Sequence, residues 1–408
     1  MNDERVIEIL NKSNKWWKEK FEFKFKPRLV YKEIKKFMHV RQIISLTGLR
    51  RTGKTTIMLK IIYDNILKFD RMNIIYFSFD EFRKIKLIEV INAYVEIINK
   101  DINKEKYLFL FDEIQKVENW EEQLKRIYDE HSNIKFIISG SESLFIRKKS
   151  RESLAGRMFE FQVKILTFKE FLSFKNLKFD NLSLYKEEIL REYKNFLFSN
   201  GFPEMVGEKG EIADKYVKNN VIEKIIYMDI PQIIPVQEPA ILEQIFKIIL
   251  NDPGEIISLD DLAKELRISR QTVSLYIGYL EKSFLIRKLY NFSRNARKTQ
   301  RKLKKYYPTI ISHELVEKNE MSGKVFETFI VNQLDAEFFW RDTYKNEVDI
   351  VKINSNILPI EIKISKVETR TLKLFMKKFR VDKGIILTYD TKEKINGVEA
   401  IPFYEFLI

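Results

Sequence analysis

The feature that most constrains this chain is a glycine-rich loop between an apolar run, residues 43–46, and a helix-like pattern. The loop Gly48-Leu49-Arg50-Arg51-Thr52-Gly53-Lys54-Thr55 fits G-x-x-x-x-G-K-[ST]. In this setting the backbone N–H groups can surround a phosphate, the helix N-terminus adds positive charge, and a lysine reaches the outer phosphates. The following hydroxyl, Thr55, can ligate Mg²⁺. We therefore expect nucleotide contacts from Gly48, Arg50, Arg51, Thr52, Gly53, Lys54, Thr55 and Thr56.

A second apolar run ends in two acids, as a nucleotide site of this type requires. The stretch YLFLFDEIQ covers residues 107–115. We expect Asp112 to hold the water shell of Mg²⁺ at the carboxyl end of this strand, and Glu113 to polarise the attacking water. The alternative is a solvated turn that carries two acids.

Two further motifs follow. The next apolar run, residues 134–138, ends in Ser139-Gly140-Ser141, where Ser141 is our candidate for sensing a γ-phosphate or its water; either serine can instead cap a helix. In SLAGR, residues 153–157, Arg157 is a candidate arginine finger for the site of a neighbouring copy in a homo-oligomer. A surface ion pair is the alternative for Arg157.

Strand-like runs alternate with helix-like patterns up to about residue 170, which predicts an α/β domain with a parallel, covered sheet. The pattern then becomes helical, and NDPGE, residues 251–255, marks a turn before a new unit. We expect four parts: a P-loop domain over 1–172, a helical segment over 173–250, a helix-turn-helix with a basic stretch over 251–312, and a mixed α/β domain over 313–408.

These motifs together resemble a family. The pattern G-x-R-R-T-G-K-T-T, then F-D-E-I-Q with Trp120, S-G-S, L-A-G-R, L-T-F-K-E-F and G-F-P-E are similar to the uncharacterised, largely archaeal AAA+ ATPases of prokaryotes. The resemblance implies an additional-strand (ASCE) sheet, a helical lid after it, and ATP rather than GTP as the nucleotide. It does not extend to a recognisable sensor-2 arginine in the lid.

Residues 257–289 read as a winged helix-turn-helix, with Ser269 as the N-cap of the second helix. We expect Arg270, Gln271, Thr272 and Tyr276 to point outward and reach a DNA groove. The stretch 287–307 carries nine Lys or Arg and no acid, so we add Arg297, Lys298, Arg301 and Lys302 as phosphate contacts, with Tyr306 and Tyr307 as stacking or packing groups. The alternative is a protein-docking module.

The stretch 346–365 reads as a hairpin that places Glu361 and Lys363 on one face and Asp349 on the partner strand. Two carboxylates and an ammonium can bind a Mg²⁺ and orient water for phosphodiester cleavage, with Glu327 as a possible fourth member. This D-x11-E-x-K pattern resembles the PD-(D/E)xK nuclease fold, a restriction-endonuclease-like α/β domain. An alternating charged face of an edge hairpin is the alternative.

Composition narrows the remaining function classes. Zero cysteines exclude disulfides and a thiol nucleophile, and three dispersed histidines make a histidine metal cluster unfavourable. Lys and Arg outnumber Asp and Glu by 73 to 59, which favours an anionic partner such as DNA. Without a long apolar run or signal peptide, we expect a cytoplasmic protein with no membrane partner. Three hypotheses remain: a Mg²⁺-dependent ATPase acting on DNA, a nucleotide-controlled protein-docking switch, and an ATP-gated defence or mobile-element nuclease.

Overall fold

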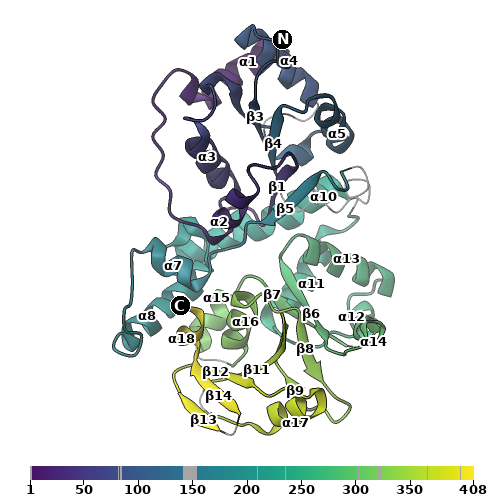
Figure 1. The fold of residues 1–408 in the computed structure, drawn as a ribbon. Helices are drawn as coiled ribbons and strands as arrows, with labels where there is room; N and C mark the ends of the chain where they lie inside the picture. Colours follow the sequence, from purple (N-terminus) through teal and green to yellow (C-terminus); the bar gives the residue numbers. More distant parts are fainter. Residues whose placement is uncertain are drawn as a thin grey trace. The chain divides into compact units, whose positions relative to one another are not determined.

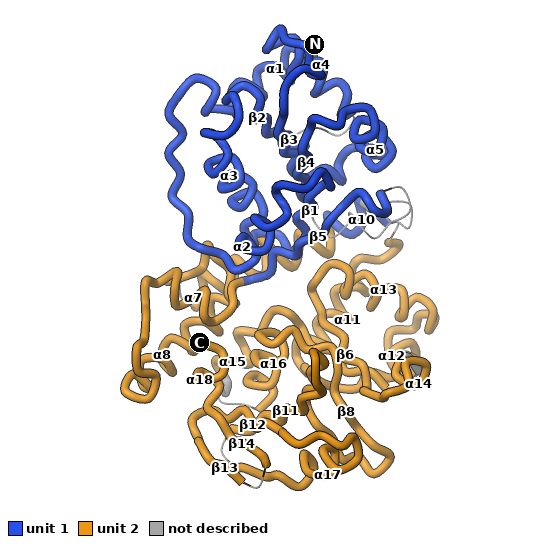
Figure 2. The backbone as a smooth tube through the Cα atoms, viewed as in Figure 1, with its two compact units in different colours: residues 1–165, 229–235 blue, residues 166–228, 236–408 orange. Residues whose placement is uncertain are grey.

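The computed structural model describes residues 2–80, 82, 85–140, 154–208, 210–234, 236–301, 303–319, 323–364, 366–395 and 397–408. The chain divides into two compact units, shown in Figure 2. Unit 1 contains residues 1–165 and 229–235, and unit 2 contains residues 166–228 and 236–408. The expected boundaries do not coincide with this division: residues 166–172, expected in the P-loop domain, fall in unit 2, and residues 229–235, expected in the helical segment, fall in unit 1.

Unit 1 is built on a parallel five-stranded sheet in the order β2-β3-β4-β1-β5. The strands are β1 (Ile43–Thr47), β2 (Ile74–Ser78), β3 (Tyr107–Asp112), β4 (Ile134–Ser139) and β5 (Met158–Gln162). Every residue of β1 and β3 is buried, which explains why both read as continuous apolar runs. Because β4 lies between β1 and β3, the sheet has the additional strand that the resemblance implies.

Helices cover both faces of this sheet (Figure 1). Alternate residues of one strand face opposite sides, so Phe109 joins the core with α1, α4 and α5, whereas Leu108 and Leu110 join the core with α2 and α3. The helices of unit 1 are α1 (Asn2–Ser13), η1 (Lys15–Trp17), α2 (Leu29–Lys36), α3 (Lys54–Asn65), η2 (Arg71–Asn73), α4 (Leu87–Ile98), η3 (Ile114–Lys116), α5 (Trp120–Glu130) and α10 (Ile230–Ile233).

The first part of unit 2 is helical, and it ends in a pair of helices, α12 (Leu259–Glu265) and α13 (Arg270–Lys282), joined by a short turn. Its first helices are α7 (Phe168–Phe174), α8 (Lys186–Ser199), η5 (Pro203–Met205), α9 (Gly210–Lys215), the π-helical η6 (Tyr216–Ile222) and η7 (Ile225–Asp229), whose last residue falls in unit 1, and α11 (Pro239–Asn251). Ser269 accepts a hydrogen bond from the Thr272 N–H, as expected of an N-cap.

The rest of unit 2 contains two sheets. They have the orders β7-β6-β8-β9 and β10-β11-β12-β14-β13. Because β6 pairs with β8, the hairpin of the expected winged helix shares a sheet with the C-terminal part. The elements are β6 (Ile286–Asn291), α14 (Ala296–Arg301), β7 (Lys304–Pro308), α15 (His313–Asn319), α16 (Gly323–Gln333), β8 (Phe338–Arg341), β9 (Glu347–Val348), β10 (Ile350–Ile353), β11 (Ile357–Lys363), α17 (Arg370–Phe379), β12 (Gly384–Thr388), β13 (Glu393–Ile395), β14 (Val398–Pro402) and α18 (Phe403–Leu407).

Among the residues that the structure describes, the helices are too short or too polar to cross a lipid bilayer.

Candidate functional site

The glycine loop connects β1 to α3 and follows a path that only glycine permits at its first position. Gly48 has a φ of 141°, and a Cβ there would lie 2.2 Å from the carbonyl oxygen of Val163. Gly53, with a φ of 95°, directly precedes the first residue of α3. The loop therefore packs against the backbone after β5 and leads into a helix N-terminus, as a phosphate site requires.

Lys54 stabilises the curled form of the loop. Its side chain is buried, and Nζ donates hydrogen bonds of 2.9 Å to the carbonyl oxygens of both Gly48 and Leu49. Burial lowers the pKa of the Lys54 ammonium, against the raising effect of Glu113 and Asp112. Thr52 is buried as well, and its hydroxyl donates to the Leu49 carbonyl at 2.9 Å. Both side chains shape the loop from inside.

The other expected nucleotide contacts lie around the loop. Arg51 is exposed and has a φ of 65°, and Thr56 is exposed in the first turn of α3. Arg50 Nη1 donates to Asp229 Oδ1 at 2.8 Å. Asp229 follows the loop by almost 180 residues, and no local pattern indicated it.

Arg28 is a second residue that the sequence pattern did not indicate. It is buried, and its guanidinium donates to the Thr52 carbonyl at 2.8 Å and to the Lys164 carbonyl at 2.6 Å. Because these two carbonyls belong to the loop and to the segment after β5, Arg28 fastens the loop to the sheet. A lone arginine before a helix carries no signal for this role.

The structure brings Thr55 and the acid at the end of β3 together. Asp112 Oδ2 accepts hydrogen bonds from the Thr55 hydroxyl at 2.6 Å and from the Tyr76 hydroxyl at 2.8 Å. Its Oδ1 accepts from the Ser139 hydroxyl and from the Glu113 N–H. A hydroxyl and a carboxylate in direct contact beside a phosphate loop are the oxygen donors that Mg²⁺ prefers, so these residues fit that ion.

Glu113 lies next to this pair and is suited to accept a proton. Burial raises the pKa of the Glu113 carboxyl, although Lys54 opposes the shift. Gln115 donates to Glu113 Oε2 at 2.6 Å and so fixes its orientation. A carboxylate with a raised pKa is a stronger base, which suits it to polarise a water molecule.

The two smaller motifs have different outcomes. Ser141 lies outside the described residues, whereas Ser139 is buried and bonds to Asp112. Arg157 directly precedes β5, and its carbonyl accepts from the Ile43 N–H at the amino-terminal end of the parallel strands. The glycine loop follows β1 at the carboxyl-terminal end of the strands. The Arg157 guanidinium pairs with Asp129 at 2.9 and 3.1 Å. Arg157 therefore stays away from the loop of its own molecule, and a role in a neighbouring copy stays a prediction.

Unit 2 contains the second expected site: Asp349 directly precedes β10, and Glu361 and Lys363 lie on β11. Ile350 pairs with Ile360, which places Asp349 opposite Glu361. Asp349 Oδ2 accepts from the Ile362 N–H at 2.8 Å, and Lys363 Nζ lies 3.9 Å from Glu361 Oε2. Burial raises the pKa of Asp349 to about 8 and that of Glu361 to about 7. Glu361 Oε1 is buried and has no hydrogen-bond partner within the described ranges.

Glu327 is bound to residues that the sequence pattern did not indicate. Its Oε1 accepts from the Tyr307 hydroxyl at 2.5 Å, and Lys305 Nζ lies 3.5 Å from the same oxygen and 2.5 Å from Glu347. Lys305 is thus buried among acids and not exposed on a basic surface. Over the part of the chain that the structure describes, no three His, Asp or Glu side chains are arranged to hold a metal ion.

Four side chains of α13 were expected to point outward, and the structure agrees for only some of them. Arg270 and Gln271 are exposed, and Arg270 pairs with Asp260 at 3.1 Å; Thr272 is half-buried in the first turn. The expectation for Tyr276 is wrong, because this side chain is only 5% exposed. It lies on the same helical stripe as the buried residues Val273, Ile277 and Leu280.

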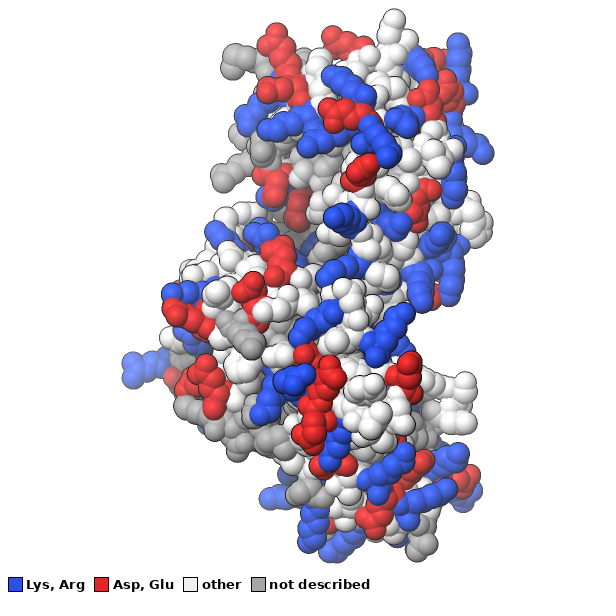
Figure 3. All heavy atoms as spheres, turned by 90° about the vertical axis from the view of Figure 1, so that its left-hand side faces the viewer, with Lys and Arg blue, Asp and Glu red and all other residues white. Residues whose placement is uncertain are grey.

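The basic stretch is also less exposed than its composition indicates. Tyr306 and Tyr307 are buried and serve packing, and Lys288 and Arg287 pair with Glu281 and Asp335. Arg297 and Lys298 on α14 are exposed. The side chain of Arg301 and all of Lys302 lie outside the described residues. Figure 3 shows a different face of the molecule, on which Lys and Arg side chains are interspersed with Asp and Glu.

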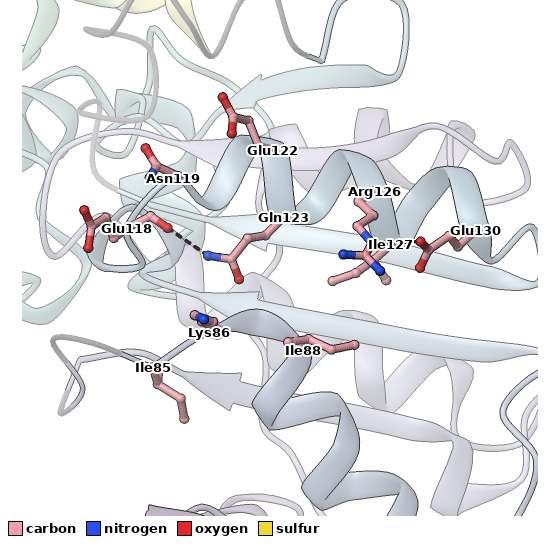
Figure 4. A pocket seen from close by; sticks show the side chains of 10 residues that line it. All are labelled: Ile85, Lys86, Ile88, Glu118, Asn119, Glu122, Gln123, Arg126, Ile127 and Glu130. Atoms are coloured by element: carbon pink, nitrogen blue, oxygen red, sulfur yellow. Dashed lines mark hydrogen bonds and ion pairs between the residues drawn. The ribbon is translucent and has the colours of Figure 1, made fainter.

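A further hollow of about 530 Å³ lies between α4 and α5 in unit 1 (Figure 4). Some of its lining side chains bond to neighbours: Gln123 donates to the Glu118 carbonyl at 2.8 Å, and Arg126 pairs with Glu130. It is lined by Ile85, Lys86, Ile88, Glu118, Asn119, Glu122, Gln123, Arg126, Ile127 and Glu130.

Comparison with protein families matches three segments of the chain. Residues 40–172 match an AAA domain, residues 190–309 a domain of unknown function (DUF8612), and residues 322–406 another domain of unknown function (DUF4143). With the glycine loop and the strand order, the first match identifies unit 1 as carrying an AAA-type P-loop domain, a fold that binds nucleotide.

Two similar proteins come from the archaeon Methanocaldococcus jannaschii, and both are uncharacterised. MJ1637 is 27% identical over 98% of this chain and 91% of its own length, and MJ1544 is 27% identical over 93% and 91%. An uncharacterised protein of Haemophilus influenzae is 26% identical over 60% of this chain and 61% of its own. The AMPPCP-bound DnaA structure from Aquifex aeolicus covers 64% of this chain and 90% of its own at 17% identity, but a TM-score of 0.29 does not establish a shared fold.

Proposed function

We propose that this protein is a Mg²⁺-dependent ATPase whose nucleotide cycle in unit 1 controls the action of unit 2 on DNA. The observation that carries the ATPase proposal is the contact of Thr55 with Asp112 beside Lys54 and Glu113. These four side chains supply a phosphate-binding cation, two oxygen donors for a metal and a base, which is the set that phosphoryl transfer to water needs.

Each residue has a defined part in this proposal. The loop amides and Lys54 bind the phosphates, and Lys54 exchanges its bonds to the Gly48 and Leu49 carbonyls for phosphate oxygens. Thr55 and Asp112 would hold Mg²⁺, which neutralises phosphate charge when bound. Glu113 orients and polarises the attacking water, and Ser139 keeps Asp112 in place through its hydroxyl.

Phosphate release from Mg-ATP is the direct test. It is measured for the wild type, Lys54→Ala and Glu113→Gln, without DNA and with duplex, forked and single-stranded DNA. Hydrolysis that DNA stimulates and both substitutions abolish supports the full proposal. Hydrolysis that ignores every DNA favours the protein-docking switch, and a wild type that neither binds nor hydrolyses ATP contradicts the ATPase proposal.

DNA contact is proposed through the start of α13 and through α14. Arg270 and Gln271 are exposed at the N-terminus of α13, and Arg297 and Lys298 are exposed on α14, so this surface can contact phosphates and bases. The test is the salt dependence of duplex binding. Arg297→Ala with Lys298→Ala should lower both the affinity and the salt slope, whereas the same double change at the exposed Lys18 and Lys20 should not. Binding that does not depend on salt contradicts DNA contact.

Nuclease chemistry is a second candidate, because Glu361 Oε1 is buried without a partner among the described residues, opposite Asp349. A buried carboxylate oxygen of this kind is a suitable donor to a divalent cation, which Asp349 and Glu361 would hold and which would activate water for phosphodiester cleavage. Lys363 would orient that water. Cleavage of DNA by the full chain with Mg²⁺ or Mn²⁺, lost in Lys363→Ala, supports this candidate. No cleavage with either metal, with or without ATP, contradicts it.

A further inference from the structure

Residues 229–235 connect the two units of the chain. They belong to unit 1, whereas residues 166–228 and 236–408 on either side belong to unit 2 (Figure 2). The segment contains the short helix α10, and Ile230 at its start is 1% exposed. The chain therefore continues into unit 2 at both ends of this segment.

The segment places a carboxylate on the glycine loop. Arg50 Nη1 donates to Asp229 Oδ1 at 2.8 Å, and the side chains of Arg50 and Asp229 are 31% and 14% exposed. Asp229 Oδ2 is buried and accepts no hydrogen bond from any residue that the structure describes. Burial raises the pKa of the Asp229 carboxyl, and the charges of Arg50, Lys54 and Lys116 oppose that rise. A carboxyl group bound to Arg50 thus already lies where the loop would offer positive charge to phosphates.

Bound phosphates would compete with this carboxylate. They carry several negative charges, which repel a nearby Asp229 and attract Arg50. If Arg50 turned to the phosphates, Asp229 would be left buried without its cation, and such an uncompensated charge is strongly unfavourable. Phosphate binding and the Arg50–Asp229 pair therefore oppose each other.

We propose that Asp229 is an autoinhibitory residue, which holds Arg50 in the nucleotide-free protein and is displaced when the phosphates bind. This inference rests on the proposed function, since it requires nucleotide in the glycine loop. Displacement frees Asp229 and α10 from the loop.

A positioning role for Asp229 would change the nucleotide affinity in the opposite direction. If Asp229 only oriented Arg50 toward the phosphates, its removal would weaken nucleotide binding. If Asp229 competes with the phosphates, its removal strengthens binding. The sign of the change in affinity therefore separates the two roles.

The test is the affinity of the full chain for a non-hydrolysable ATP analogue with Mg²⁺, measured by calorimetry. Asp229→Asn should bind about tenfold more tightly than the wild type, a difference of about 1.4 kcal/mol. Asp129→Asn is the matched control, since Asp129 also pairs with an arginine of unit 1, but at the amino-terminal end of the strands, away from the loop. Equal or weaker binding by folded Asp229→Asn, with wild-type binding intact, overturns the inference. Absence of binding in all three folded proteins overturns the proposed function and the inference with it.

Hydrogen exchange of the backbone amides in 229–235 gives an independent readout. The analogue should accelerate exchange there in the wild type, and Asp229→Asn should exchange at the faster rate without it. Unchanged or slower exchange in the wild type on addition of the analogue overturns displacement, even if the affinity changes as expected.

Discussion

Glu361→Gln is expected to remove a pH-dependent destabilisation of unit 2. The Glu361 side chain is 3% exposed, and burial raises the pKa of its carboxyl from an ordinary 4.5 to about 7. The folded protein therefore holds this proton more tightly than the unfolded chain does. The stability that the carboxyl contributes is fully present below pH 4.5 and is lost as the pH rises through about 7.

The size of this effect follows from the two pKa values. The interval from 4.5 to about 7 corresponds to about 3 kcal/mol of unfolding free energy. In a unit of this size each kcal/mol changes the unfolding temperature by about 2–4 °C. Glutamine has the shape of the neutral acid and does not ionise. The unfolding temperature of Glu361→Gln should therefore exceed that of the wild type by an amount that grows from near zero at pH 4.5 to about 6–12 °C at pH 7.5.

Scanning calorimetry of the full chain in buffer with a chelator measures this difference, because a bound cation would stabilise the carboxylate. Glu399→Gln is the matched control, since Glu399 is an exposed acid of β14 in the same sheet. If the unfolding temperatures of wild type and Glu361→Gln ran parallel from pH 4.5 to pH 7.5, the reasoning from burial would be refuted.

Three further predictions concern the loop, the base and α13. Gly48→Ala should destabilise unit 1 by about 1–3 kcal/mol and abolish binding of an ATP analogue, because its Cβ would meet the Val163 carbonyl at 2.2 Å; calorimetry checks both. Glu113→Gln should bind ATP normally in equilibrium titrations yet release phosphate about 10²–10⁴-fold more slowly, as expected of a base. Tyr276→Ala should destabilise unit 2 by about 3–5 kcal/mol in urea unfolding, whereas the exposed Gln271→Ala should stay within about 0.5 kcal/mol.

Features that depend on residues close together in the chain were predictable from the sequence. The strands of unit 1 read as apolar runs because both faces of the sheet are covered, and the glycine loop has its pattern because Gly48 and Gly53 adopt backbone angles that other residues avoid. The N-cap at Ser269 and the hairpin that places Asp349 opposite Glu361 follow from local geometry in the same way.

Features that depend on distant contacts were decided by the tertiary structure. Arg28 precedes the glycine loop in the sequence and Asp229 follows it by almost 180 residues, yet both bind the loop. Lys305 on β7 likewise pairs with Glu327 and Glu347, which come later in the sequence. Tyr276 was misplaced because a tyrosine suits either a DNA groove or a core, and the packing of α13 selected the core. A sequence pattern shows which side chains share a face, but only the folded chain shows what that face contacts.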